Sequence, residues 1–170
     1  ESFVLCPHVS PDGDALGSTL ALKMALEKAG KQVTVMVDDD VPKAFGFLPQ
    51  LDSFVKPDEN NPVAADILVV LDASSLDRIG RVAQAVKYNA MVNIDHHISN
   101  TQYADYLYLN TEAAATGEIL CQLVEKLGIT PDKDLPIQRR QPCVRQQNCW
   151  NMAHARMKFR TRSERIPEPI

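Results

Sequence analysis

An uninterrupted aliphatic run, Ile67–Leu71, is the stretch that most constrains the fold, and Asp72 follows it directly. A run of this kind, without polar alternation, is typical of a parallel strand that is buried on both faces, and we place that strand at residues 65–72. Two shorter runs, at residues 4–6 and 90–94, have the same character. Together with the helical patterns between them, they predict an α/β fold: a doubly wound, mostly parallel sheet flanked by helices.

Helical and alternating apolar patterns predict the remaining elements. Residues 15–29 place Leu and Met at helical spacing and are followed by Gly30, which indicates an amphipathic helix with a glycine stop. Residues 111–127 show a comparable pattern and predict a second long helix. The other predicted elements are a strand at 31–37, a short helix and turn at 41–62, a weak helix at 79–86 and an aromatic-rich edge strand at 103–109.

Side chains that carry chemistry follow each of the three aliphatic strands. Because parallel strands place their carboxyl ends at the same edge of a sheet, we expect these side chains to gather there. Carboxylate oxygens and imidazole nitrogens are ligands of divalent cations such as Mn2+ and Mg2+, so the sequence predicts a metal site at that edge. The candidates are His8, Asp12, Asp14, Asp72, Asp95, His96 and His97.

Other interpretations of these residues stay open at this stage. Asp12 and Asp14 are suited to capping the next helix, and Asp72 is suited to the same role. The acidic triple Asp38–Asp40 also lies at the end of a predicted strand, and we interpret it as a solvated loop rather than a metal site.

Length and composition limit the class of protein. With 170 residues and 45% hydrophobic content, the chain is long enough for one well-cored domain. No apolar run approaches the length of a membrane span and the chain does not open with a signal-peptide pattern, so we expect no membrane partner and a cytoplasmic location. A homodimer is an open option.

The formal net charge of −4 divides unevenly along the chain. Residues 135–170 carry +6, which leaves −10 on the remainder. An acidic body that handles phosphate esters needs bound cations to do so. The charge balance therefore favours a metal site over a basic nucleic-acid groove.

A change of character at Leu135 divides the chain. Up to residue 134 the apolar residues recur with helical or strand period, whereas residues 135–170 are rich in Arg, Gln and Pro and show neither period. We therefore predict a folded domain at 1–134 and an irregular basic tail at 135–170. A shifted reading frame and disorder are both compatible with such a tail.

Three motifs, in order along the chain, resemble those of the DHH phosphoesterases. They are the segment His8–Ser18, Asp72 at the end of its aliphatic strand, and the segment Ile94–His97. The resemblance extends over about residues 3–128 and implies that 1–134 is the N-terminal DHH domain. Each motif lies at the end of a predicted strand, as the family's pattern requires.

Within the family, the branch of nano-RNases and 3'-phosphoadenosine 5'-phosphate phosphatases is the most similar. The similarity rests on the Pro11–Ser18 segment, on Arg78 six residues after Asp72, and on the stretch Asn93–Asn100. The resemblance implies a metal-dependent phosphoesterase that hydrolyses short RNA oligonucleotides or nucleoside 3',5'-bisphosphates with two Mn2+ ions, Mg2+ being the alternative ion.

The resemblance also implies a role for the candidate residues. The first ion is expected on His8, Asp12 and Asp72, and the second on Asp14, Asp72 and His96, with Asp72 shared. His97 is expected to face the substrate phosphate. The chemistry of the side chains adds that Asp95 could orient a histidine and that Arg78 could clamp a phosphate, a plain surface charge being the alternative for Arg78.

Two features of the family's pattern are missing from this sequence. The family has a further metal-ligand Asp in an Asp-Thr-Gly-x-Phe motif, yet no Asp follows residue 134 here. A second domain with a Gly-Gly-Gly-His motif is also missing. Two alternatives to an active enzyme therefore stay open: a nucleotide- or metal-binding module without turnover, and a doubly wound domain whose acidic loops only cap helices.

Overall fold

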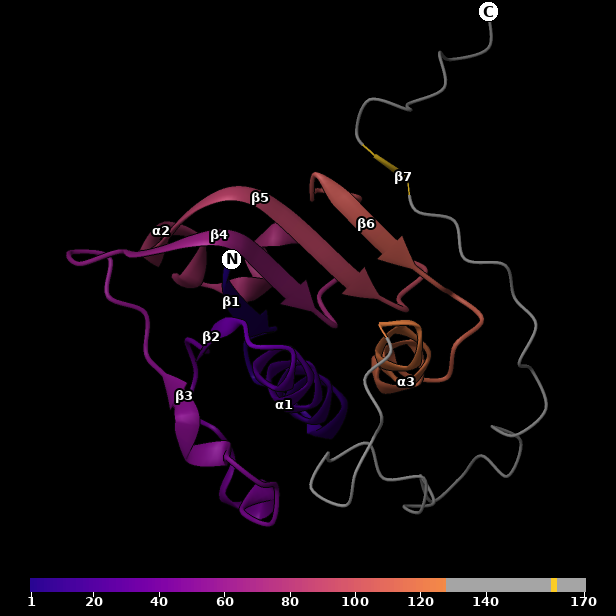
Figure 1. Ribbon diagram of the computed structural model, residues 1–170, viewed down its shortest axis with the longest axis horizontal. Coiled ribbons are helices and arrows are strands. Elements are labelled where there is room, and N and C mark those ends of the chain that lie inside the picture. The colour runs from indigo at the N-terminus through magenta and orange to yellow at the C-terminus, as the bar shows by residue number, and fades with distance from the viewer. Residues whose placement is uncertain (128–159, 162–170) are drawn as a thin grey trace, which may run out of the picture.

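A seven-stranded sheet forms the centre of the molecule (Figure 1). The computed structural model describes residues 1–127 and the backbone of residues 160–161. The predicted boundary at residue 134 and nearly all of the predicted tail lie outside the described residues. The strands are β1 (Ser2–Pro7), β2 (Gln32–Met36), β3 (Phe54–Val55), β4 (Val63–Leu71), β5 (Val86–Asp95), β6 (Tyr106–Leu109) and β7 (Arg160–Thr161).

The strand order is β3-β2-β1-β4-β5-β6-β7, and every pairing from β3 to β6 is parallel. Only β7 runs antiparallel, beside β6. The chain winds outward from β1 to β3, then crosses back to β4 and winds outward the other way. This order confirms the predicted doubly wound, mostly parallel α/β fold, and it places the reversal of direction between β1 and β4.

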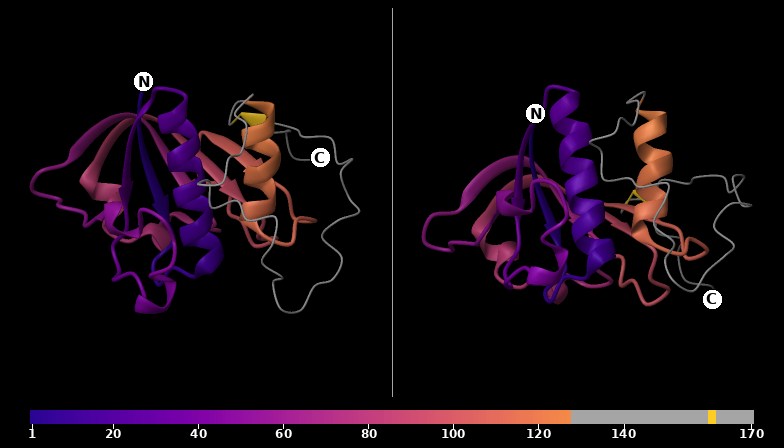
Figure 2. Two further views of the ribbon diagram at one scale, coloured as in Figure 1. Left: turned by 60° about the horizontal axis from the view of Figure 1, so that its bottom comes forward. Right: turned by 90° about the horizontal axis from the view of Figure 1, so that it is seen from below.

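Helices cover both faces of the sheet. They are α1 (Gly13–Lys28), η1 (Lys43–Phe45), η2 (Leu51–Ser53), η3 (Leu76–Ile79), α2 (Val82–Ala85) and α3 (Thr116–Lys126). The two long helices, α1 and α3, contact each other on one face, and η3 with α2 lies on the other (Figures 1 and 2). No helix among residues 1–127 is both long enough and apolar enough to cross a bilayer.

Strand β1 shows how the sequence builds two cores. Its side chains alternate, so that Leu5 packs with α1 and α3 whereas Val4 and Cys6 pack with the η3–α2 side. All three side chains are at most 1% exposed. Burial on both faces explains why the inner strands are continuous aliphatic runs without polar alternation.

Several elements differ from the sequence prediction. Helix α3 begins at Thr116 rather than 111, because residues 110–115 form turns before it. The weak helix predicted at 79–86 is divided between η3 and the four-residue α2, and β5 already begins at Val86. Strand β3 was not predicted, because two residues are too few to show a period. β6 also pairs with β7, so it is not the edge strand that its pattern predicted.

Candidate metal centre

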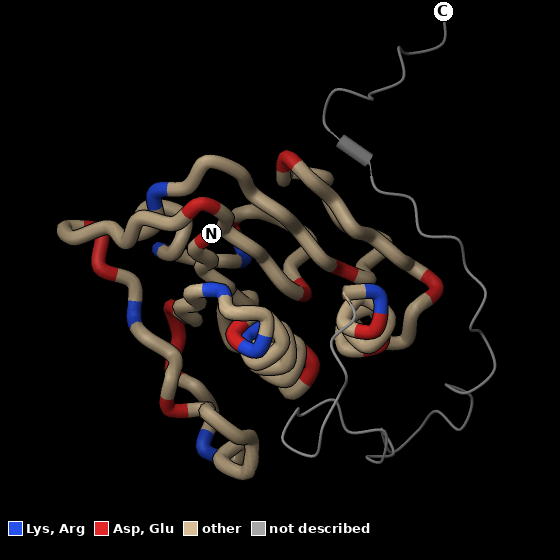
Figure 3. The backbone as a smooth tube through the Cα atoms, viewed as in Figure 1, with Lys and Arg blue, Asp and Glu red and all other residues tan. Residues whose placement is uncertain are grey.

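The predicted candidates meet at the carboxyl edge of the sheet, where the strand order reverses. His8, Asp12 and Asp14 follow β1, Asp72 follows β4, and β5 ends at Asp95, next to His96 and His97. In Figure 3 acidic positions lie at the carboxyl ends of β4 and β5 and at the start of α1. This is the crevice in which open α/β sheets bind their ligands.

Two overlapping groups of side chains have metal-ligand spacing, and both contain Asp72. One is His8, Asp12 and Asp72; the other is Asp72, His96 and His97. Within each group, one potential ligand atom per residue lies within 4.8 Å of the others. His8 Nε2 is 3.9 Å from Asp72 Oδ2, whereas His96 Nε2 is 3.5 Å from Asp72 Oδ1. The two carboxylate oxygens of Asp72 therefore face different histidines.

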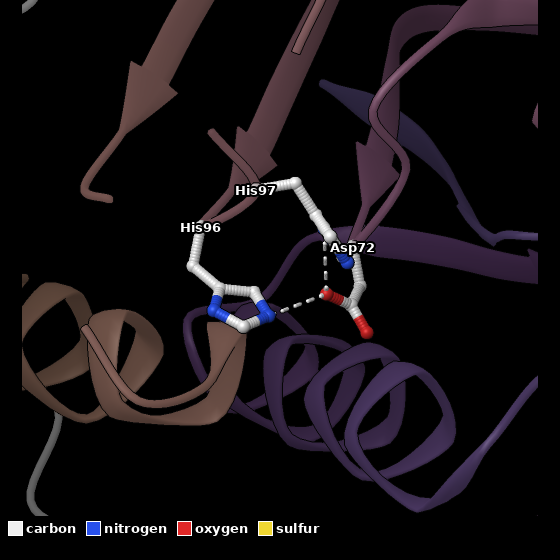
Figure 4. Close-up of side chains that lie close together, drawn as sticks. All are labelled: Asp72, His96 and His97. Atoms are coloured by element: carbon white, nitrogen blue, oxygen red, sulfur yellow. Dashed lines mark ion pairs between the residues drawn. The ribbon is translucent and has the colours of Figure 1, made fainter. Parts of the chain in front are cut away.

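Asp72 has an unusual backbone and a buried side chain. Its φ is 59°, in the left-handed region that non-glycine residues rarely adopt, and it is 3% exposed. The side chain accepts a hydrogen bond from Thr116 Oγ1 (2.9 Å). Figure 4 shows the rings of His96 and His97 beside its carboxylate, the contacts marked being those with Oδ1. The N-cap alternative for Asp72 is wrong, because η3 begins only after Ser75.

The environment of Asp72 disfavours the ionised form of its carboxyl group. Burial raises the pKa of its carboxyl group, the charge of Asp14 raises it further, and the hydrogen bond from Thr116 offsets part of the shift. Among residues 1–127, no Lys or Arg forms an ion pair with Asp12, Asp14 or Asp72. Crowded carboxylates without a cationic side chain are suited to a divalent cation, so this donor set fits Mn2+ or Mg2+.

His8 and Asp12 are each held by their own loop. His8 is 6% exposed, and its Nδ1 lies 2.6 Å from the carbonyl oxygen of Val9, so a proton on Nδ1 leaves Nε2 free to bind a metal. Asp12 Oδ1 accepts from the amides of Asp14 and Ala15 at the start of α1. The capping interpretation is therefore right for Asp12, and its second oxygen stays available.

Asp14 does not cap α1 but turns toward α3. Its Oδ2 accepts from the amide of Thr116 (2.8 Å) and its Oδ1 from the amide of Gly117 (2.9 Å). The same carboxylate lies 3.9 Å from His96 Nε2. Asp14 is thus in the cluster, although its carboxylate oxygens are already hydrogen-bonded to the first amides of a helix.

The two histidines are oriented by different partners. His96 Nδ1 lies 3.2 Å from the carbonyl oxygen of Ala113, which leaves Nε2 toward Asp72 and Asp14. His97 Nδ1 lies 2.7 Å from Asp95 Oδ1. Burial lowers the pKa of His97, but the hydrogen bond and charge of Asp95, with the charge of Asp72, outweigh it and raise the pKa above the ordinary value.

A family model for the DHH family, N-terminal domain, matches residues 2–143. The chain belongs to the DHH family. That match covers the strand ends and loops that carry the candidate residues, and it agrees with the resemblance found in the three motifs. The DHH domain therefore places its Asp-His-His segment at the end of β5, one strand away from Asp72.

The relatives of this DHH chain are named for two activities. It is 34% identical over 125 residues to the bifunctional oligoribonuclease and PAP phosphatase NrnA of Thermus thermophilus, covering 74% of this chain and 37% of that protein. It is 26% identical over 125 residues to the NrnA of Bacillus subtilis, covering 72% of this chain and 38% of that protein. The chain thus spans under two fifths of these relatives, and the match confirms the predicted branch.

A solved structure shares the fold. The exopolyphosphatase-related protein of Bacteroides fragilis superposes on 75% of this chain and 40% of that one, with a TM-score of 0.67 and 28% identity. The arrangement of sheet and helices in the DHH domain is therefore one already seen in a related protein.

Behind the Asp-His-His segment lies a buried network that the sequence did not reveal. Asn93 Nδ2 donates to the carbonyl oxygens of Val70 (3.2 Å) and Ala73 (3.3 Å), on both sides of Asp72. Asn100 Nδ2 donates to Asn93 Oδ1 and to Asp95 Oδ2. The one available signal was a polar residue, Asn93, inside the aliphatic run of β5. This network ties the turn at Asp72 to the carboxylate that orients His97.

Arg78 lies at the rim of the site on the His8 side. Its Nη2 is 3.2 Å from His8 Nδ1, its carbonyl oxygen accepts from the amide of Val9 (2.7 Å), and the residue is exposed. Its guanidinium is therefore near the candidate ligands and within reach of a bound molecule.

The acidic triple differs from the predicted solvated loop at two of its three residues. Asp38 accepts from the backbone amide and guanidinium of Arg81, and Asp39 accepts from the amide and hydroxyl of Ser10. Only Asp40, whose side chain is 99% exposed and pairs with Lys56, fits the prediction. Sequence reasoning missed these contacts because their partners are distant along the chain.

Proposed function

We propose that this chain is the metal-binding half of a two-metal phosphoesterase that hydrolyses short RNA oligonucleotides or nucleoside 3',5'-bisphosphates. The observation that carries the proposal is the convergence of histidines and carboxylates on buried Asp72 at the switch point of the sheet. The names of the NrnA relatives, bifunctional oligoribonuclease and PAP phosphatase, support the same substrate classes. Mn2+ is the ion proposed, with Mg2+ as its substitute.

In this proposal Asp72 serves both ions. His8 and Asp12 complete the first set, with His8 approaching Asp72 from the Oδ2 side. Asp14 and His96 complete the second set, His96 approaching Asp72 Oδ1. His97 also lies close enough to Asp72 to share a metal ion with it. Its Nδ1 is hydrogen-bonded to Asp95, however, so we assign its Nε2 to the substrate.

The chemistry supplied by bound Mn2+ is polarisation of the phosphate and activation of a water. The chain's own residues bind and orient. His97 Nδ1 bonds to Asp95, which fixes the direction of the ring and leaves Nε2 for a phosphoryl oxygen. Arg78 offers a planar pair of donors to the same phosphate group.

The proposal is tested first by binding. Calorimetric titration of the 170-residue chain with Mn2+ is expected to show two ions per chain, and Asp72→Ala is expected to remove both. Hydrolysis is then followed with a ribodinucleotide and with 3'-phosphoadenosine 5'-phosphate. Two ions bound together with weak, Mn2+-dependent release of nucleotide would support the proposal. No Mn2+ binding by the unaltered chain would overturn it.

A second candidate is a metal-binding module without turnover, the alternative that the sequence leaves open. The chain spans under two fifths of its NrnA relatives, and no Asp follows residue 134. If Mn2+ binds but neither substrate is hydrolysed, a fusion to the remaining domain of a relative, with its Asp-Thr-Gly-x-Phe segment, distinguishes the two. Activity that appears only in the fusion, by orders of magnitude, would identify this chain as the binding half.

A further inference from the structure

We propose that the segment Ala113–Gly117, at the start of α3, is the positioning element for the second ion's ligands. The inference rests on the proposed function, because it concerns ligands assigned there. One short segment contacts all three residues of that set: Asp14 through two amides, Asp72 through a hydroxyl and His96 through a carbonyl oxygen.

The contact with Asp14 fixes both oxygens of its carboxylate. The amides of Thr116 and Gly117 are the first two of α3 and point to Oδ2 and Oδ1 respectively. A Cβ at position 117 would lie 3.2 Å from Asp14 Oδ1, closer than such contacts usually are. Glycine at this position therefore lets the helix end approach the carboxylate.

Thr116 contributes a second contact through its side chain. It is fully buried, and its hydroxyl donates to Asp72 Oδ1, the oxygen on the His96 side. Among the described residues, it is the one side-chain hydrogen bond to this carboxylate. The hydroxyl thus stabilises the ionised carboxylate that a cation needs and sets which oxygen faces His96.

His96 receives the third contact. With its proton on Nδ1 donated to the carbonyl oxygen of Ala113, the ring presents the lone pair of Nε2 to the carboxylates. Partners of this kind fix the tautomer and direction of a metal-binding imidazole. His8 and Asp12 are hydrogen-bonded to other segments, and Thr116 contacts Asp72 on its Oδ1 side, so the segment acts on the second ion's side of the site.

The experiment compares Thr116→Val with Thr116→Ser by calorimetric titration with Mn2+. Valine keeps the shape and the backbone amide but removes the hydroxyl, whereas serine keeps it. We expect Thr116→Val to weaken one of two binding events about 10- to 100-fold and to leave the other within about threefold. Thr116→Ser is expected to bind Mn2+ with nearly the affinities of the unaltered chain. Thr19→Val is the matched control, because Thr19 is also fully buried and its hydroxyl donates within α1, to the carbonyl oxygen of Ala15.

Gly117→Ala separates positioning from folding. Alanine inside the first turn of a helix favours the helix, so thermal melting of the metal-free chain should be unchanged or higher. The added methyl group displaces Asp14, so the same binding event should weaken. A role of this glycine in folding alone would instead leave Mn2+ binding intact.

The outcomes distinguish the two proposals. Two Mn2+ events that Thr116→Val and Gly117→Ala leave unchanged, or weaken equally, would overturn the positioning role alone. Failure of the unaltered chain to bind Mn2+ would overturn the proposed function and this inference with it. Selective loss of one event, with normal melting of Gly117→Ala, is the expected result.

Discussion

The two sides of Asp72 are built differently. On the His8 side, the proposed ligands His8 and Asp12 lie within one loop, and Asp12 accepts from the amides of Asp14 and Ala15. On the His96 side, Asp14 accepts from residues 102 and 103 positions further along the chain. The first side is therefore organised by local spacing and the second by the packing of α3 against α1. Local changes should affect the first side, and changes in α3 the second.

The largest expected effect lies where the two sides meet. Asp72→Ala removes the carboxylate shared by both ligand sets, so Mn2+ binding should be abolished in calorimetric titration. Asp38→Ala should retain most of it, because Asp38 contacts Arg81 and none of the proposed ligands. Equal losses in the two variants would contradict the central position of Asp72.

A test of the His8 side separates capping from metal binding at Asp12. Asparagine is as good an N-cap as aspartate, so Asp12→Asn should melt like the unaltered chain, whereas Asp12→Ala should lose about 1 kcal/mol of stability. Both variants should weaken one Mn2+ event. If Asp12→Asn binds both ions normally, Asp12 is a helix cap and nothing more.

The network behind Asp72 should affect both sides. Asn93→Leu removes the amide that donates to the carbonyl oxygens of Val70 and Ala73 and accepts from Asn100. Ala73 keeps its bond from the Tyr103 hydroxyl and Asn100 its bond to Asp95. The expected loss is about 1–3 kcal/mol in urea unfolding, with weaker binding of both ions because the turn at Asp72 loosens. Weakening of a single event would show that Asn93 belongs to one side only.

The smallest effect is expected in the acidic triple, and it depends on pH. The hydrogen bond from Arg81 lowers the pKa of Asp38 below its ordinary value of 3.8. The ionised form is thus favoured in the fold, so its contribution is present above pH 3.8 and is lost as the pH falls through the lower folded pKa. The melting temperature of Asp38→Asn should be lower than that of the unaltered chain at pH 7. The difference between the two melting temperatures should disappear in acid.

Asp40→Asn is the matched control for that measurement. The Asp40 side chain is 99% exposed, and its pair with Lys56 lies in solvent, where such pairs contribute little. Its melting temperature should equal that of the unaltered chain at every pH. A comparable gap for both variants would mean that the difference reflects net charge rather than the contact with Arg81.

The elements that could be predicted are those with a repeating signal. Buried parallel strands need continuous aliphatic runs, so β1, β4 and β5 were visible, and the residues after them could be placed at one edge. The start of α3 could not, because residues 111–115 continue the helical pattern but form turns. Thr116 was hidden for the same reason, since it looked like an interior residue of a longer helix.

Contacts that depend on tertiary structure left no local trace. Asp38 and Asp39 look like a solvated run until the fold brings Arg81 and Ser10 beside them. Only Asn93 gave a hint, because a polar residue in a buried strand needs a partner. The roles of the ligands and the substrate stay predictions, since they came from resemblance.

The span of chain between Asp14 and Thr116 bears on how this protein matures. During synthesis the His8–Asp14 loop emerges about a hundred residues before the helix end that orients Asp14. A nascent chain that ends before residue 116 has one local set of donors and an unsupported second set. On the proposed function, the second set of donors is complete only in the finished domain, so binding of a second cation would follow completion of the fold.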